Sequence, residues 1–331
     1  EHPATVEAVL SLGNVLNLAG RFAEADSLFV RAEAAAEALG LADVAAEARS
    51  GRGEALVSAG RTDEAEEAAR DALMRAEEIF GPRHPRVVTP LMTLALVELR
   101  RGAYDAADTL YGRAQSVEEG FTGEESVRLA DVLVNRGINL NSTGRVAEAE
   151  PLLRRALAIR ESIHGPRHPE VATVLSGLGS VAYWEGDHWG AAELHARAAE
   201  IYRESYDGPH PHVATELANQ GTAILYEGAW QEAARLLREA LAEYEAAVPD
   251  DRYNLSVTRI KLGTALVRAG RVEEGEREVR AGYDELSELS APDVSFLHVA
   301  RGILAEAYQA LGRTEEAERF EALYLEGRSE R

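Results

Sequence analysis

The sequence contains no cysteine, and this absence excludes disulfide bonds, thiolate metal ligands and a cysteine nucleophile. Aromatic residues make up only 6% of the chain, and lysine occurs once, at Lys261. No apolar run approaches the roughly 20 residues that a membrane-spanning helix needs, and no signal peptide heads the chain. We therefore expect a cytoplasmic location.

The abundant residues favour helices and oppose two classes of partner. Hydrophobic residues make up 46% of the 331 residues and are dominated by alanine and leucine, which, like glutamate and arginine, are good helix formers. The net charge of −22 opposes binding to nucleic acid, which needs a basic surface, and to anionic membranes. The composition predicts an all-α protein whose partner is neither nucleic acid nor a membrane.

A repeat of 40 to 42 residues runs through the whole chain. A glycine recurs at Gly20, Gly60, Gly102, Gly144, Gly186, Gly228, Gly270 and Gly312. Five residues after each glycine stands a small residue, at Ala25, Ala65, Ala107, Ala149, Ala191, Ala233, Gly275 and Ala317. A second small residue stands seven positions before each glycine, as at Gly13 and Gly137. A fixed period of this length indicates stacked helix pairs.

Each recurring position of the repeat has a mechanical interpretation. The recurring glycine ends the first helix of a pair, where a left-handed residue without a Cβ is favoured. The small residues allow the two helices to approach closely where they cross. Four repeats open with a histidine–proline pair, at positions 2–3, 84–85, 168–169 and 210–211. Proline is suited to the first helical position, so these pairs predict helix starts.

The offsets between the small residues carry a family resemblance. They are 12 and 19 positions, as in the sets Gly13, Ala25 and Ala32 and Gly137, Ala149 and Ala156. Together with the segment GPRHPEVATVLSGLG at 165–179, this pattern resembles tetratricopeptide repeats of the 42-residue kind found in kinesin light chains and in bacterial multi-repeat proteins. HEAT and armadillo repeats have similar periods, but they do not explain these offsets.

The resemblance implies an all-α, right-handed superhelical solenoid of about eight helix-turn-helix repeats, with residues 1–331 as a single domain. The first repeat looks ordinary, whereas a solenoid usually needs an atypical capping repeat. We therefore expect a region excised from a larger chain. The resemblance also implies that this chain is the sensor or regulatory part of a bacterial signalling protein.

No motif in the sequence supports catalysis. There is no phosphate-binding loop of the Walker type and no nucleophile elbow, and Lys261 lacks a glycine-rich lead. His164 and His168 have the spacing of a helical metal pair, but Gly165 and Pro166 break any helix between them. We therefore expect no enzymatic activity, no cofactor and no metal.

A binding groove is the function that the repeat geometry supports, because the first helices of such repeats line the concave side. Counting from the mid-helix small residue, the inward stripe carries the candidate peptide-binding residues Asn14, Asn17, Arg100, Asn135, Asn141, Tyr183, Trp184, Asn219, Tyr226, Lys261 and Arg268. An asparagine amide can both donate to and accept from a peptide backbone. The resemblance matches Asn135 and Asn219 to asparagines that clamp peptide backbone. The cations and aromatics of the stripe could hold an acidic side chain and an apolar anchor.

The leading hypothesis is thus a scaffold that binds a protein or peptide segment, which belongs to a partner or to its own parent chain. The alternative is a structural or oligomerisation module in which the groove is incidental. The sequence leaves the partner open, and it leaves open whether Arg52, Arg136 and Gln220 face the groove or pair internally. These three residues stand where most repeats have a packing leucine. Gly275 and Gly282 replace alanine in repeat 7, which predicts loose helices there.

Overall fold

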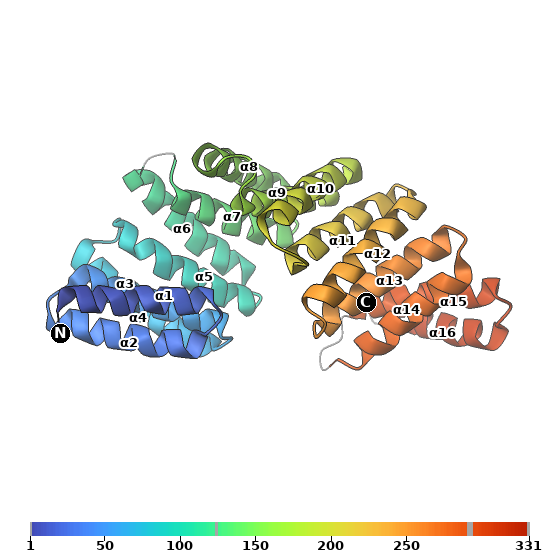
Figure 1. Ribbon diagram of the computed structural model, residues 1–331, viewed down its shortest axis with the longest axis horizontal. Helices are drawn as coiled ribbons and strands as arrows, with labels where there is room; N and C mark the ends of the chain where they lie inside the picture. Colours follow the sequence, from blue (N-terminus) through green and yellow to red (C-terminus); the bar gives the residue numbers. More distant parts are fainter. Residues whose placement is uncertain (1, 123–124, 290–293, 330–331) are drawn as a thin grey trace. The chain divides into compact units, whose positions relative to one another are not determined.

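The computed structural model describes residues 2–122, 125–289 and 294–329, and within these ranges it contains sixteen α-helices and no β-strand (Figure 1). The first helices of the eight pairs are α1 (Pro3–Leu18), α3 (Ala42–Ser58), α5 (Val88–Arg100), α7 (Val127–Ser142), α9 (Pro169–Glu185), α11 (Pro211–Tyr226), α13 (Arg252–Arg268) and α15 (Val294–Ala310). The second helices are α2 (Phe22–Ala38), α4 (Thr62–Phe80), α6 (Tyr104–Thr122), α8 (Val146–His164), α10 (His188–Ser205), α12 (Trp230–Ala247), α14 (Val272–Ser287) and α16 (Thr314–Ser329). A short 3₁₀ turn, Pro85–Val87, precedes α5.

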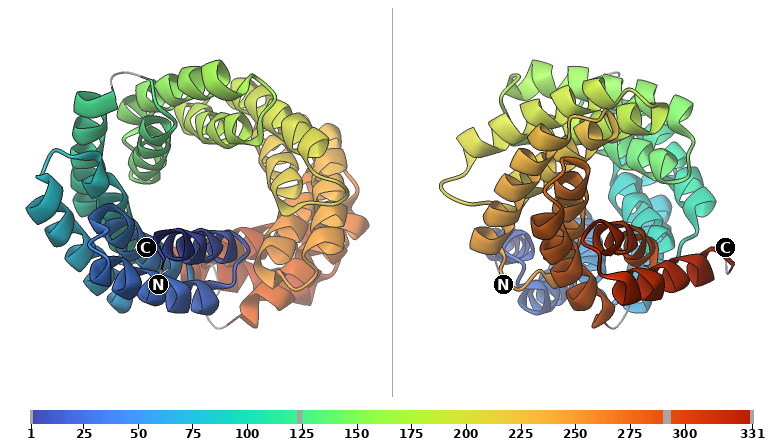
Figure 2. Two further views of the ribbon diagram at one scale, coloured as in Figure 1. Left: turned by 60° about the vertical axis from the view of Figure 1, so that its left-hand side comes forward. Right: turned by 90° about the vertical axis from the view of Figure 1, so that its right-hand side faces the viewer.

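The chain forms two compact units, Glu1–Ile163 and His164–Arg331, here called unit 1 and unit 2. Within each unit, helices that follow one another along the chain pack together, as α1 and α2 or α13 and α14 do. Among the described residues, four pairs of successive first helices also pack together: α1 with α3, α3 with α5, α11 with α13, and α13 with α15. Figure 2 shows this stacking of helix pairs from two further directions. The helix-turn-helix prediction is confirmed. The prediction that residues 1–331 form a single domain stays a prediction.

The recurring glycines end the first helices as predicted. All eight have a positive φ, between 70° and 87°, which is the left-handed region that a residue with a Cβ rarely adopts. The amide of Gly186, for example, donates to the carbonyl of Tyr183 one turn earlier. The turn between the two helices of each pair is therefore fixed by the backbone freedom of one residue.

The histidine–proline pairs open helices, and the histidine acts as the N-cap. The Nδ1 atoms of His2, His84, His168 and His210 each accept a hydrogen bond, at 3.2 Å, from the backbone amide two residues later. This bond satisfies one of the amides that a helix start leaves unpaired. The recurring histidines are therefore helix-start residues, as the histidine–proline pairs predicted, and the structure adds that each one is a side-chain N-cap.

The predicted small residues lie in the core between the paired helices. Six of the eight, from Ala25 to Ala233, are fully buried, and Gly275 is buried as well. Ala317, in the last repeat, is only partly buried. This burial confirms the register of the repeat in seven of the eight pairs.

The prediction of loose helices in repeat 7 is wrong. A Cβ added to Gly275 would lie 2.7 Å from the carbonyl oxygen of Gly263 and 2.8 Å from the backbone nitrogen of Val267. A Cβ added to Gly282 would lie 2.6 Å from the carbonyl oxygen of Ser256. The two glycines therefore let α13 and α14 approach backbone to backbone, so their effect is closer packing.

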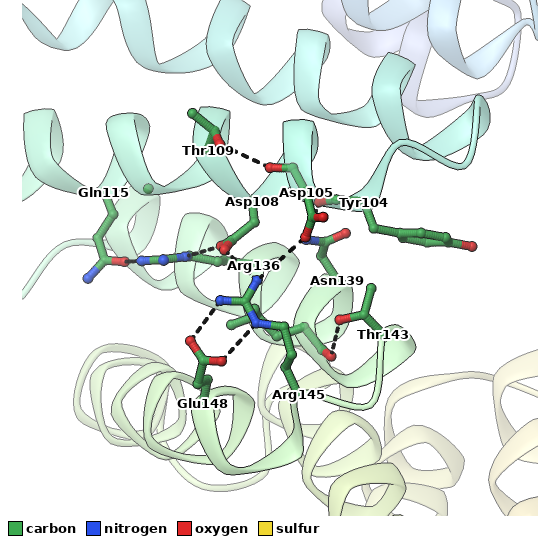
Figure 3. A network of polar contacts seen from close by, with 12 residues as sticks. Tyr104, Asp105, Asp108, Thr109, Gln115, Arg136, Asn139, Thr143, Arg145 and Glu148 are labelled. Carbon is green, nitrogen blue, oxygen red and sulfur yellow. Dashed lines mark hydrogen bonds and ion pairs between the residues drawn. The ribbon is translucent and has the colours of Figure 1, made fainter.

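Arg136, one of the two arginines that replace the packing leucine, pairs internally (Figure 3). Arg136 donates to Asp108 at 2.7 Å and to Gln115 at 2.8 Å, and Arg145 donates to the other oxygen of Asp108 at 2.9 Å and also to Glu148. Burial alone would raise the pKa of Asp108, but the bonds from the two arginines outweigh it and hold this pKa below its ordinary value.

The same network recurs in repeat 2 and is missing from repeat 6. Arg52 and Arg61 share Asp26 at 2.9 and 3.0 Å, as Arg136 and Arg145 share their aspartate. Around Gln220, the corresponding acid and second arginine are replaced by Ala192 and Ala229. The open question about these positions is thus answered for both arginines, which bind acids of the preceding second helix.

Candidate functional site

A pocket of about 710 Å³ lies in unit 2 and is built mainly by the first helices α9, α11, α13 and α15. Two second helices contribute His195 and Trp230. Six of the predicted site residues line this pocket: Tyr183, Trp184, Asn219, Tyr226, Lys261 and Arg268. They come together because each occupies the inward stripe of its own first helix. Helix α11 packs against α13 and α13 against α15, and the ring of Tyr183 on α9 contacts that of Tyr226 on α11.

The pocket is rich in aromatic rings that are open to solvent. Trp184 is 68% exposed, Tyr226 is 65% exposed and Trp230 is 42% exposed. Tyr183 packs edge-on against both Trp184 and Tyr226, with ring centroids 5.7 and 5.6 Å apart. Burial, followed by the hydrogen bond with Tyr226, raises the pKa of Tyr183, which keeps its hydroxyl protonated. Clustered exposed aromatics of this kind mark binding surfaces.

The positive charges of the pocket have different surroundings. Arg268 forms an ion pair with Glu306 at 2.8 Å. Lys261 is half-buried, and its Nζ lies 5.5 Å from the ring centroid of Phe296. No acidic side chain among the described residues pairs with Lys261, and burial lowers its pKa to about 8. The pocket thus holds one cation that is already neutralised and one that is not.

A buried polar pair lies under the pocket. His195 of α10 and Glu216 of α11 are each 3% exposed, and His195 Nδ1 lies 2.7 Å from a carboxylate oxygen of Glu216. The ring also packs over Gly179 of α9, where an added Cβ would lie 2.7 Å from Nε2. The pair therefore ties three helices together beside the site.

Four residues in or under this pocket lie outside the predicted stripe. The predicted stripe covered each first helix from six residues before its mid-helix small residue to five residues after it. Phe296 lies further towards the start of its helix, and Trp230 lies on a second helix. His195 and Glu216 could have been found by comparing repeats, because one repeat away the corresponding residues are Leu237 and Val174. A histidine and a glutamate at apolar repeat positions are the signal.

The other five predicted residues lie in unit 1 and do not line this pocket. Asn14 and Arg100 are exposed. The amide of Asn135 donates to the backbone carbonyl of Asp131 at 2.9 Å, within its own helix. The side-chain oxygens of Asn17 and Asn141 are buried without a hydrogen-bond partner in the described structure. That these five residues bind peptide stays a prediction, as does a shared grip on one ligand by Asn135 and Asn219.

Metal binding finds no support in the part of the chain that the structure describes. The rings of His164 and His168 are stacked with centroids 4.5 Å apart, on a turn that contains Gly165. No group of three or more His, Asp or Glu residues in the described ranges could hold a metal ion. The described helices also include none that is long and apolar enough to cross a membrane.

Comparison with protein families identifies the class. Tetratricopeptide-repeat models match residues 44–117, 128–204 and 171–246, and a second such model matches 256–281 and 298–320. The chain belongs to the tetratricopeptide repeat family. No curated protein matches it.

Solved structures share the fold at low sequence identity. The apo form of RapI is 13% identical, with a TM-score of 0.71 over 98% of each chain. The kinesin light chain repeats of Podosopora anserina are 20% identical, with a TM-score of 0.51 over 62% of this chain and 96% of that one. NprR in complex with its cognate peptide NprX is 11% identical, with a TM-score of 0.59 over 97% of this chain and 89% of that one.

Proposed function

We propose that this protein is a non-catalytic interaction module that binds an extended segment of a protein along its first helices, with the unit 2 pocket as the anchor site. The observation that carries the proposal is the convergence of Tyr183, Trp184, Tyr226 and Trp230 on one pocket. An aromatic side chain in such a pocket supplies a large apolar contact at little cost in conformational entropy.

Two further features support a peptide as the ligand. Asn219 and Thr222 line the same pocket and offer polar groups to a peptide backbone. NprR, a structure of the same fold, was solved with a bound peptide. The parent context that we propose is a bacterial signalling protein, in which the segment belongs to a partner or to another part of the chain.

The proposal can be tested by selecting linear peptides from a phage-displayed library on the full chain. Selected peptides should bind Trp184→Ala at least about thirtyfold more weakly, because loss of an aromatic anchor costs about 2 kcal/mol or more. Trp189→Ala is the matched control, since Trp189 is 55% exposed on α10 but does not line the pocket. Peptides that bind both variants with the same affinity as they bind the parent chain would contradict the proposal.

Self-association is a second candidate function, and one surface of α1 favours it. Leu12 and Val15 are 50% and 59% exposed, whereas Leu94 and Val97, at the same positions of repeat 3, are 5% exposed and fully buried. A second copy of the chain could cover this apolar face. Light scattering should then show a mass that rises with concentration, and Leu12→Glu should abolish the rise. A constant monomer mass would exclude this candidate.

A further inference from the structure

We propose that Lys261 is a covalent capture site, at which the lysine amine condenses with the carbonyl group of an aromatic aldehyde held in the unit 2 pocket. The product is an imine: the amine nitrogen bonds to the carbonyl carbon, and the carbonyl oxygen leaves as water with the two amine protons. The inference goes beyond peptide binding and does not depend on it, since it assigns a small molecule to the pocket. It concerns a single residue, because Lys261 is the only lysine of the chain.

The first argument is that the surroundings of Lys261 favour its neutral, nucleophilic form. Among the described residues, none with a carboxylate pairs with Lys261 or lines the pocket. Burial lowers the pKa of the amine to about 8. About one fifth of this amine is therefore neutral at about pH 7.4, against about one thousandth of an exposed lysine. A lysine that is desolvated in an apolar pocket is suited to imine formation.

The second argument is the cavity beside the amine. Its volume of about 710 Å³ lies in the range of pockets that hold small organic ligands. The rings of Trp184, Tyr226 and Trp230 line it, and Lys261 Nζ lies 5.5 Å from the ring centroid of Phe296. Aromatic rings prefer offset-stacked or edge-on contacts with one another. A ligand ring that packs on these side chains therefore brings a carbonyl substituent to the amine.

The third argument is that the described lining residues include no other primary amine and no thiol. The guanidinium of Arg268 is held by Glu306 at 2.8 Å, and an arginine is not deprotonated in proteins. The ring of His195 contacts Glu216 at 2.7 Å, and a ring nitrogen cannot form an imine. An aldehyde in the pocket therefore has one reaction partner, the amine of Lys261.

The test compares two aldehydes, 2-naphthaldehyde as the aromatic probe and propanal as a probe without a ring. Each is equilibrated with the full chain at about pH 7.4 and trapped with borohydride, which reduces the imine to a stable secondary amine. Peptide mapping by mass spectrometry then gives the labelled fraction of each site. Arg277→Lys supplies an exposed reference lysine, because Arg277 is exposed on α14. The α-amine of the expressed chain is a second reference, since its ordinary pKa of about 7.7–8.0 is close to that of Lys261.

Both aldehydes should label Lys261 at least about tenfold more than the lysine introduced by Arg277→Lys, because more of its amine is neutral. Relative to propanal, naphthaldehyde should prefer Lys261 over the α-amine at least about fivefold, since aromatic rings lie beside Lys261. Trp184→Ala should lower this preference at least about threefold. Trp189→Ala is the matched control and should leave it within about twofold, because Trp189 is exposed on α10 outside the pocket. 2-Naphthalenemethanol, which has the ring but no carbonyl, should protect Lys261 and not the α-amine.

The pH dependence gives a second readout. Labelling of Lys261 should rise with pH and level off by about pH 9, where its amine is already neutral. Labelling of the lysine introduced by Arg277→Lys should keep rising to about pH 10.4. The other titratable or charged groups that line the pocket are Tyr183, Tyr226, His195 and Arg268. If both lysines follow the same profile, the pocket does not keep the amine neutral and the inference is overturned.

The outcomes separate this inference from the proposed function. Labelling of Lys261 that does not exceed that of the lysine introduced by Arg277→Lys would overturn the capture site. Equal preference for the two aldehydes, or a naphthaldehyde preference that survives in Trp184→Ala, would overturn the aromatic ligand class. Peptide selection tests the proposed function independently. Selected peptides that require Trp184 would uphold that function even if Lys261 is never labelled, and peptides that ignore Trp184 would contradict it even if the aldehyde is captured.

Discussion

The buried pair of His195 and Glu216 allows a quantitative test of how unit 2 is held together. Each residue is 3% exposed, and the 2.7 Å contact joins α10 to α11. Replacing Glu216 by Val, the residue of the preceding repeat, leaves the imidazole buried without this partner. Replacing His195 by Leu, the residue of the following repeat, leaves the carboxylate in the same state. Either single change should cost about 1–3 kcal/mol, the usual range when a buried polar group loses its hydrogen-bond partner.

The double substitution His195→Leu plus Glu216→Val should cost little. It restores the apolar residues that the neighbouring repeats carry, and Leu237 already packs over Gly221 as His195 packs over Gly179, with an added Cβ 2.9 Å from the leucine Cγ. Apolar replacement of a buried pair is neutral or stabilises by about 1–4 kcal/mol in other proteins. We therefore expect a coupling energy of several kcal/mol in the double-mutant cycle.

Urea unfolding followed by tryptophan fluorescence is the suitable assay, because Trp184, Trp189 and Trp230 all lie in unit 2. Circular dichroism of the same samples reports both units and shows whether unfolding has more than one step. A double variant that is as unstable as the singles would refute the reasoning. Such a result would mean that the shapes of the His195 and Glu216 side chains stabilise the packing, in addition to the contact between them.

The remaining predictions concern packing, pairing and charge. Gly275→Ala plus Gly282→Ala should destabilise the protein by about 1–3 kcal/mol through overpacking, and a higher urea midpoint would contradict the close approach of α13 and α14. Ala149→Leu should cost a similar ~1–3 kcal/mol, measured in the same way, and no loss would refute the register. Arg136→Leu should lower stability by about 1–3 kcal/mol because buried acceptors lose their donor, an effect that high salt should not reproduce. Lys261→Met should raise the free energy of unfolding near pH 7 by about 1–3 kcal/mol, because it removes a buried charge. Folding lowers the pKa of Lys261, so the parent protein should become more stable as the pH rises from about 8 to about 10.4. The Lys261→Met variant should not show this gain.

The sequence alone predicted every turn between paired helices, because these turns depend on local backbone geometry. Gly186 needs a positive φ and Pro169 a helical φ whatever lies around them. The buried positions of small residues such as Ala25 could also be predicted from the sequence, because these residues recur with the period at which paired helices cross. For the same reason, helical spacing by itself was enough to identify six residues of the pocket.

Tertiary structure decided which side chains meet. Whether glycine at 282 loosens or tightens repeat 7 depends on the distance between two backbones, and that distance does not follow from helix propensity. Arg136 faces an acid 28 residues away, and His195 faces one 21 residues away, through packing between consecutive helices. Lys261 and Asn135 looked alike as inward polar residues, yet one is unpaired in an aromatic pocket and the other bonds its own helix. Backbone conformation is set over a few residues, whereas the partner of a buried polar group is set by neighbours that only folding brings within hydrogen-bond distance.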